Sequence, residues 1–151
     1  MPRSPLLAIV VADGDGVPAA LAAIAHGVPP GSEPLVIAAD GGAAKALAAG
    51  LRPTLVLGDG DSLAPAVRDE LERAGVPVEL VPPEKDESDT ELCIAAALAR
   101  GARSIRIAGA LGGSRVEHAL ANLLLLAHPM LDGVDAAIVA PPSTIRRVGT
   151  A

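Results

Sequence analysis

Four aspartates occupy two short segments of this sequence at spacings that suit a metal ion. Asp59 and Asp61 are two positions apart, and Asp86 and Asp89 are three positions apart. Carboxylates that converge without a cation repel one another, so a divalent cation shared by the two segments is the economical interpretation. Because both segments offer only oxygen ligands, Mg²⁺ is the predicted ion, and Mg²⁺ commonly shares its coordination sphere with substrate phosphates.

A glycine-rich segment further along the chain supplies groups that suit an anion. The backbone amides of Gly112 and Gly113 can approach a phosphate closely, and the helix expected to begin near Arg115 directs its positive end at the same place. Arg115, His118 and Asn122 occupy positions i, i+3 and i+7, so they share one face of that helix. A metal site opposite a glycine loop with an arginine predicts phosphoryl transfer.

Each of these segments also fits an ordinary structural role when it is taken alone. Aspartate and glycine dominate solvated turns, which is the plain interpretation of the acidic and glycine-rich segments. Ser88 and Glu91 have the spacing of a capping box at the start of a helix, and so do Ser114 and Glu117. His118 also fits a neutral histidine that bonds to a backbone carbonyl. A functional site is favoured only if several of these segments meet.

The elements that must position these segments are strands that alternate with helices. Aliphatic runs of strand length show no alternation with polar residues, which predicts strands covered on both faces. These runs lie at 6–11, 35–39, 55–57, 78–81, 105–108 and 136–139, and the helix-like stretches lie at 17–25, 42–49, 65–74, 90–100 and 115–127. The alternation predicts an α/β fold, a three-layer, doubly wound, mainly parallel sheet of about six strands with helices on both faces.

In such a sheet the loops that follow the strands meet at one edge, where ligands bind. The polar clusters fall in the loops after the second to fifth strands, at residues 40–42, 58–62, 85–90 and 109–118. Asp13 and Asp15 follow the first strand at the same edge, where a polar turn is the favoured interpretation and a role in nucleotide binding is the alternative. The predicted topology therefore brings carboxylates, glycines and one arginine to a common edge.

The composition excludes several other classes of protein. The length of 151 residues fits one domain that spans 1–151, and the chain lacks Phe, Tyr and Trp. Without aromatic rings and with a net charge of −6, it is not expected to bind nucleic acid. Its first apolar run is too short to cross a membrane. Cys93 is the only cysteine, so a reducing compartment, the cytoplasm, is expected.

Taken in order, these motifs resemble the catalytic domain of thiamine pyrophosphokinase from about the second predicted strand to residue 126. The resemblance implies an α/β domain that uses ATP and Mg²⁺ to transfer pyrophosphate to the hydroxyl of thiamine, with AMP and thiamine diphosphate as products. It implies that Mg²⁺ binds Asp59, Asp61 and Asp89. The implied catalytic residues are Asp59, Asp61, Asp86, Asp89, Arg115 and His118. The implied nucleotide and phosphate contacts are Asp40, Gly41, Gly42, Thr90, Gly112, Gly113, Ser114, Arg115 and Asn122. Either Asp86 or His118 is the candidate acceptor of the hydroxyl proton.

The chain departs from the family pattern in ways that bear on the acceptor. Gly60 replaces a residue that is commonly aromatic, Glu117 replaces an aspartate, and Ser114 is an extra residue. The family typically has a second, β-sandwich domain that helps to close the thiamine pocket across a dimer, and this domain is expected to be absent from 1–151. A homodimer is a further expectation. Thiamine is the predicted acceptor, and the alternatives are a hydroxymethyl heterocycle of the pterin type or a catalytically weak nucleotide-binding scaffold.

Overall fold

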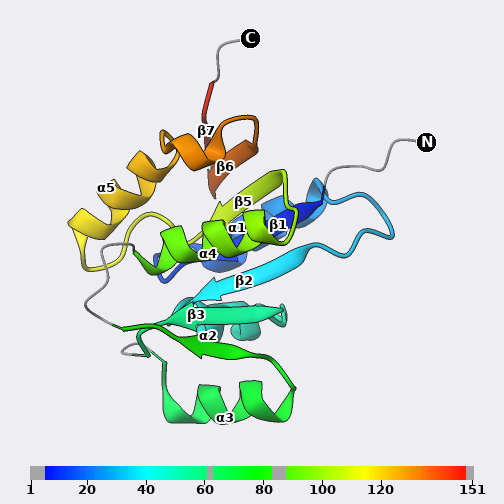
Figure 1. The fold of residues 1–151 in the computed structure, drawn as a ribbon, viewed down its shortest axis with the longest axis vertical. Coiled ribbons are helices and arrows are strands. Elements are labelled where there is room, and N and C mark those ends of the chain that lie inside the picture. The colour runs from blue at the N-terminus through cyan, green and yellow to red at the C-terminus, as the bar shows by residue number, and fades with distance from the viewer. Residues whose placement is uncertain (1–5, 61–62, 83–87, 149–151) are drawn as a thin grey trace.

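A computed structural model describes residues 6–60, 63–82 and 88–148, which form one sheet flanked by helices (Figure 1). The strands of this sheet are arranged in the order β4-β3-β2-β1-β5-β6-β7. They are β1 (Leu7–Val11), β2 (Leu35–Ala39), β3 (Leu55–Gly58), β4 (Val78–Leu80), β5 (Ser104–Ala108), β6 (Asp135–Ala140) and β7 (Ser143–Arg146). Every neighbouring pair is parallel except β6 and β7, which are antiparallel.

Helices cover both faces of the sheet because both faces are aliphatic. On one face lie α1 (Val17–His26), α2 (Gly42–Ala48) and α3 (Pro65–Arg73). On the other lie α4 (Asp89–Ala99), α5 (Val116–Leu125) and the short 3₁₀ helix η1 (Pro129–Leu131). Successive residues of β1 point to opposite faces, so Ala8 and Val10 join the α4 side of the core while Ile9 and Val11 join the α1 side. A strand that is buried on both faces needs an apolar residue at every position, as the sequence shows.

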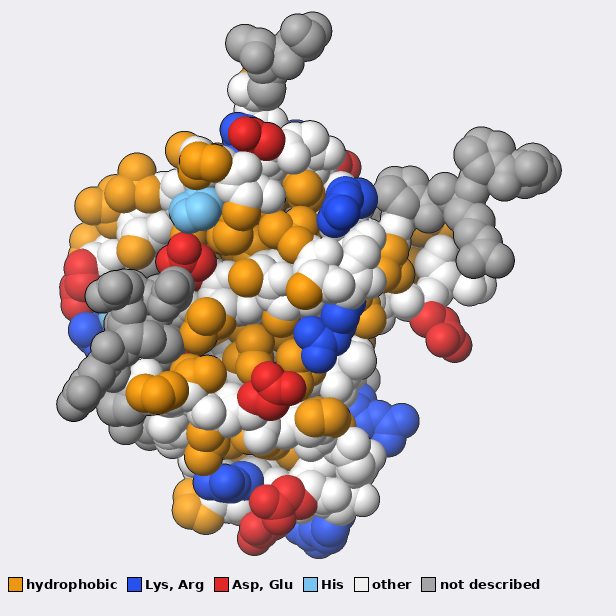
Figure 2. Space-filling model, viewed as in Figure 1, with side chains coloured by type: hydrophobic (Ala, Val, Ile, Leu, Met, Phe, Trp, Pro, Cys, Tyr) orange, Lys and Arg blue, Asp and Glu red, His pale blue; other side chains and the backbone are white. Residues whose placement is uncertain are grey.

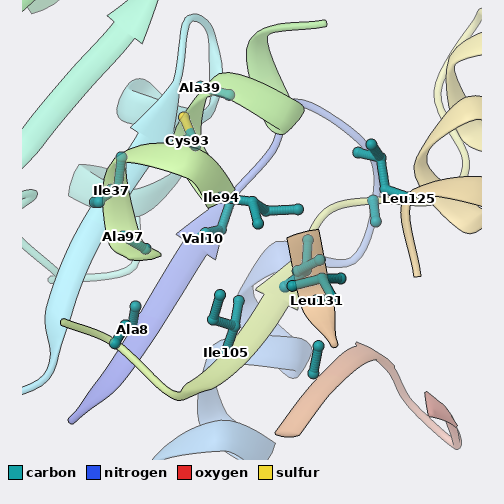
Figure 3. Packing of buried hydrophobic residues seen from close by; sticks show 14 of the residues in the cluster. Ala8, Val10, Ile37, Ala39, Cys93, Ile94, Ala97, Ile105, Leu125 and Leu131 are labelled. Carbon is teal, nitrogen blue, oxygen red and sulfur yellow. The ribbon is translucent and has the colours of Figure 1, made fainter. Parts of the chain in front are cut away.

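The core under α4 is built from aliphatic side chains of modest size. Ile94 and Ala97 of α4 lie over Val10 and Ile37 of the central strands (Figure 3). Cys93 is fully buried in the same cluster, and its burial raises the pKa of the thiol far above the ordinary range. The thiol therefore stays protonated and acts as a small apolar residue of the core.

The predicted α/β fold, with a doubly wound sheet covered on both faces, is confirmed, but the strand count is not. A seventh strand, β7, pairs antiparallel with β6 at the edge of the sheet. Its residues are mostly exposed and polar, so no aliphatic run marks it in the sequence. Asp135 of β6 pairs with Arg106 of β5 and with Arg146 of β7, so it links the three strands. The hydrogen bond from Arg106, together with the charges of both arginines, holds the pKa of Asp135 below its usual range.

The direction of winding reverses between β1 and β5, the strands at the centre of the sheet. From β1 the chain moves outward through β2, β3 and β4, and it then places β5 and β6 on the other side of β1. The loop after β1 leads to a helix on one face and the loop after β5 to a helix on the other, which leaves a crevice between them. The strand-to-helix loops gather at the left of Figure 1. Within the described ranges, no helix is both long and apolar enough to traverse a bilayer.

Candidate active site

A pocket of about 440 Å³ opens at this crevice. Its walls are the loops that follow β1, β2, β3 and β5, together with the first turns of α4 and α5. The lining residues with polar side chains are Asp13, Asp40, Asp59, Ser88, Asp89, Thr90, Ser114, Arg115, His118 and Asn122. All of these except Asp13 and Ser88 are site residues that the sequence predicts. Residues from distant segments are thus brought to one pocket.

Three aspartates from three different loops meet in this pocket. Carboxylate oxygens of Asp40, Asp59 and Asp89 all lie within 4.8 Å of one another. Oxygen ligands on opposite sides of a Mg²⁺ ion lie about 4 Å apart, which is twice the Mg–O distance. A small contraction of the cluster therefore lets three carboxylates share one Mg²⁺, and the all-oxygen donor set fits that ion.

Asp40 reaches this cluster through an unusual backbone conformation. Its φ of 43° lies in the left-handed region, which aspartate tolerates better than most residues, and its N–H donates to the carbonyl of Leu57 at 2.7 Å. The end of β3 passes directly beside it, because a Cβ on Gly58 would lie 2.8 Å from the Cβ of Asp40. The glycine before Asp59 is therefore needed so that two aspartates from neighbouring strands can approach each other.

The acidic cluster differs in membership from the metal set that the sequence predicts. That set is Asp59, Asp61 and Asp89, with Asp40 placed among the nucleotide contacts. In the structure Asp40 joins Asp59 and Asp89. Asp61 and Asp86 lie outside the described residues. Asp40 is only 7% exposed, so its carboxylate lies deep in the pocket.

The first turn of α4 places Asp89 and Thr90 in the pocket. Ser88 caps the helix, since its Oγ accepts a hydrogen bond from the N–H of Glu91 at 3.1 Å. This bond is the Ser88 half of the predicted capping box, and the Glu91 carboxylate also lies 3.4 Å from Nε2 of His128. The cap fixes the start of α4 at Asp89. Asp89 and Thr90 therefore lie in the first turn of the helix, where both line the pocket.

The pocket-facing side of α5 carries Arg115, His118 and Asn122, as their spacing predicts. Asn122 is 8% exposed, and its Nδ2 donates to the carbonyl of Ala110 at 2.9 Å. The side chain therefore ties the glycine-rich loop to α5, in addition to lining the pocket.

Arg115 is held by a neighbouring carboxylate at the mouth of the pocket. Its Nε donates to Oε1 of Glu117 at 2.9 Å, and this hydrogen bond lowers the pKa of Glu117. The predicted capping box of Ser114 and Glu117 is wrong, because α5 begins at Val116 and Arg115 occupies the cap position without a side-chain cap bond. An anionic ligand of Arg115 must compete with Glu117 for the guanidinium.

Two predicted nucleotide contacts, Gly41 and Gly42, are not among the residues that line the pocket. Both glycines serve close packing in this fold. A Cβ on Gly42 would lie 2.2 Å from the carbonyl oxygen of Val11, and one on Gly41 would lie 2.4 Å from Oδ2 of Asp13. The glycine pair thus brings α2 and the loop after β1 into direct contact beneath the site.

Three residues outside the predicted site set support its wall, and of these Lys45 is the one with no role predicted from the sequence. Asp13 lines the pocket, Asp15 accepts a hydrogen bond from the N–H of Gly113, and Lys45 of α2 pairs with Asp13. The polar turn predicted for Asp13 and Asp15 is present, but it is part of the site. The available signal was the position of Lys45, a lone cation in an alanine-rich helix close to the edge where the loops meet.

The chain is similar to known thiamine pyrophosphokinases in sequence and in structure. Residues 31–138 match the family described as thiamin pyrophosphokinase, catalytic domain. A thiamine pyrophosphokinase of Bacillus subtilis (strain 168) is 36% identical over 92 residues, which make up 61% of this chain and 42% of that protein. Crystal structures of thiamine pyrophosphokinases from Bacillus subtilis and Geobacillus thermodenitrificans superpose with TM-scores of 0.71 and 0.70, at 27% and 30% identity.

These superpositions cover most of this chain and only part of the relatives. They include 89% of this chain, and 60% and 59% of the Bacillus and Geobacillus chains. The yeast thiamin pyrophosphokinase, at 13% identity and a TM-score of 0.71, shares the fold over 93% of this chain and 60% of its own. The chain thus spans less than two thirds of the length of these relatives, from 42% to 60%.

Proposed function

Because this chain belongs to the thiamin pyrophosphokinase catalytic-domain family, we propose that it transfers pyrophosphate from ATP to the hydroxyl of thiamine in a Mg²⁺-dependent reaction. The products are thiamine diphosphate and AMP. The observation that carries the proposal is the meeting of Asp40, Asp59 and Asp89 in one pocket with Arg115. A carboxylate cluster for a cation and an arginine for phosphate oxygens are what transfer of a phosphorylated group requires.

The acidic cluster is the proposed Mg²⁺ site. Asp40, Asp59 and Asp89 provide the ligands within the described residues. Asp61, predicted from sequence, is a further proposed ligand. When bound, Mg²⁺ supplies positive charge that neutralises the phosphate oxygens of ATP. Without that charge, the acidic cluster repels a triphosphate, so the site requires a cation in order to bind its substrate.

The opposite wall of the pocket is the proposed phosphate-binding side. Arg115 binds oxygens of the transferred phosphates once they displace Glu117, and Thr90 and Asn122 line the same pocket. The thiamine oxygen attacks the β-phosphorus, the bond from that phosphorus to the oxygen that joins it to the α-phosphate breaks, and AMP leaves. His118, which faces the pocket, or Asp86 takes the hydroxyl proton.

An acceptor panel tests the proposed reaction. The purified chain, incubated with ATP and Mg²⁺, is expected to form AMP and thiamine diphosphate in equal amounts and to prefer thiamine over a hydroxymethyl pterin. A chelator is expected to stop the reaction. Preference for the pterin would contradict thiamine as the acceptor. Calorimetric binding of an ATP analogue without turnover on any acceptor would indicate a nucleotide-binding scaffold, and absence of binding would reject the whole assignment.

We further propose that this chain forms a dimer, as the resemblance to its family implies, and that the two copies associate through α5. Val116, Leu120 and Leu124 are 79%, 56% and 64% exposed on one side of the helix. Hydrophobic side chains gather over α5 at the left edge of the face in Figure 2. In an antiparallel pair Leu120 meets its own copy and Val116 meets Leu124, so the stripe complements itself.

Sedimentation analysis tests this association. The wild-type chain is expected to sediment as a dimer and the Leu120→Glu variant as a monomer. Leu80 is 47% exposed on β4, far from α5 in Figure 1, and Leu80→Glu is the matched control that is expected to leave the dimer intact. A wild-type monomer, or a dimer that survives Leu120→Glu, would contradict the role of α5.

A further inference from the structure

Two loops of the pocket wall are joined to each other by hydrogen bonds. The backbone N–H groups of Ala12, Gly14 and Asp15 donate to carbonyls of Ala108, Gly109 and Leu111 at 2.8, 2.6 and 2.9 Å. In the reverse direction, the N–H of Gly113 donates to Oδ2 of Asp15 at 2.9 Å. The loop after β1, here called the template loop, thus holds the glycine-rich loop after β5 through hydrogen bonds in both directions.

The contact between the two loops leaves no room for a side chain at Gly14 or Gly112. A Cβ on Gly14 would lie 2.2 Å from the carbonyl oxygen of Gly109, and one on Gly112 would lie 2.7 Å from Oδ2 of Asp15. Both distances are well below van der Waals contact. The Asp15 carboxylate therefore lies directly against the backbone of Gly112 while it accepts the hydrogen bond from Gly113. This carboxylate is the acceptor of the Gly113 N–H in the structure.

Lys45 fixes the template loop from the other side. Its Nζ donates to the carbonyl oxygens of Asp13 and Gly14 at 2.8 and 2.7 Å, and lies 3.1 Å from Oδ1 of Asp13. One ammonium group thus makes three interactions with two consecutive residues, which matches its three N–H donors. It also neutralises the carboxylate of Asp13, which among the described residues is the one acidic residue that lines the pocket outside the acidic cluster.

We propose that Asp15 and Lys45 are positioning residues that hold the glycine-rich loop, residues 109–113, in the shape that binds the phosphates of ATP. Neither residue is among those that line the pocket, so each acts through the loops. The inference rests on the proposed function for the identity of the ligand. It assigns the N–H of Gly113 a structural role, and it leaves Arg115 and the remainder of the loop to contact the phosphates.

Variants of Asp15 test the first half of the proposal. Hydrogen exchange of the Gly113 amide, followed by NMR in the protein without nucleotide, is expected to be at least about tenfold faster in Asp15→Ala, because the loss of one charge-assisted hydrogen bond is worth a factor of this order. The KM for ATP is expected to rise by about the same factor with kcat little changed, as for an interaction that serves substrate and transition state equally. Asp15→Asn retains an acceptor oxygen and is expected to behave nearly as the wild type.

The control for Asp15 is Asp69→Ala on α3, an exposed aspartate remote from the pocket. It is expected to leave the exchange rate and both kinetic constants unchanged. Wild-type exchange and KM in Asp15→Ala would overturn the role of Asp15. An asparagine variant as impaired as the alanine variant would overturn its action as a hydrogen-bond acceptor for Gly113.

Variants of Lys45 separate positioning from charge neutralisation. Lys45→Met is expected to raise the KM for ATP by about tenfold, which corresponds to about 1.4 kcal/mol, and to speed exchange of the Gly113 amide. In the double variant Lys45→Met with Asp13→Asn the unpaired charge is removed but the clamp on the two carbonyls is still missing. The double variant is therefore expected to stay impaired, and full recovery would overturn the positioning role. Arg68→Met on α3 is the matched control.

The two measurements also distinguish this inference from the proposed function. The exchange rate of the Gly113 amide is read without any substrate. If the wild type forms no AMP with any acceptor, the proposed function fails, whereas the exchange rates still decide whether Asp15 and Lys45 hold the loop. If the wild type is active and the variants of both residues match it in exchange and KM, the inference fails and the proposed function stands.

Discussion

Replacement of Asp59 by asparagine is expected to lower the rate of AMP formation from ATP and thiamine by roughly a hundredfold to a thousandfold, as when one group that stabilises transition-state charge is removed. The amide has no negative charge, so the cluster with Asp40 and Asp89 loses one of the charges that attract a cation. The fold is expected to survive, because removal of one of three neighbouring like charges relieves repulsion. Steady-state kinetics and thermal unfolding measure the two effects.

A second readout of Asp59→Asn follows the metal directly. Mg²⁺ that binds only the folded chain raises the melting temperature of the wild type, and this increase is expected to be smaller in the variant. Asp69→Asn on α3 is a control of the same chemistry outside the pocket, and it is expected to match the wild type in both readouts. Undiminished AMP formation by Asp59→Asn would refute the assignment of the acidic cluster.

Replacement of Gly42 by alanine is expected to destabilise the chain by about 1–3 kcal/mol, the usual cost of forcing an extra methyl group into a packed contact. The new Cβ would lie 2.2 Å from the carbonyl oxygen of Val11, and a backbone atom of a central strand cannot move aside as a side chain end can. α2 must then shift away from β1, which also displaces Asp40 just before it. Urea unfolding measures the loss of stability, and the acceptor assay is expected to show reduced turnover.

The control for Gly42→Ala is another glycine next to a helix. Gly27 follows α1 with a φ of −92°, and a Cβ there would lie 3.6 Å from the carbonyl oxygen of Ile24, which is ordinary contact. Gly27→Ala is therefore expected to change the free energy of unfolding by less than about 0.5 kcal/mol. Equal stability of the Gly42 and Gly27 variants would contradict the packing role of Gly42.

Most strands and helices of the fold can be predicted from the sequence, because strands that are buried on both faces of the sheet must be continuously aliphatic. Leu35–Ala39 is predicted and found with the same bounds, and α1 differs from its prediction by one residue. β7 cannot be predicted in this way, because an exposed edge strand needs no apolar run and is defined by its pairing with β6. β7 forms only because it pairs with β6, and the hydrophobic pattern of residues 143–146 does not reveal that pairing.

The site divides in the same way. The spacing of Arg115, His118 and Asn122 on one helix is local information, and all three line the pocket. The membership of Asp40 in the acidic cluster is not local, because it depends on a left-handed backbone at residue 40 and on the passage of Gly58 beside it. A carboxylate can be placed in a loop from sequence, but the direction in which it points follows from the packing of neighbouring strands.

By itself, the sequence determined that this chain is an α/β protein with acidic and glycine-rich loops at one edge, since hydrophobic periodicity and loop chemistry are written along the chain. Only the tertiary structure decided that Asp40 meets Asp59 and Asp89, that Asp15 accepts the hydrogen bond from Gly113, and that Lys45 clamps the loop after β1. These contacts join residues from 19 to 98 positions apart, a span that can be counted in the sequence. Their partners are set by the order of the strands and the reversal of winding between β1 and β5, which no single segment encodes.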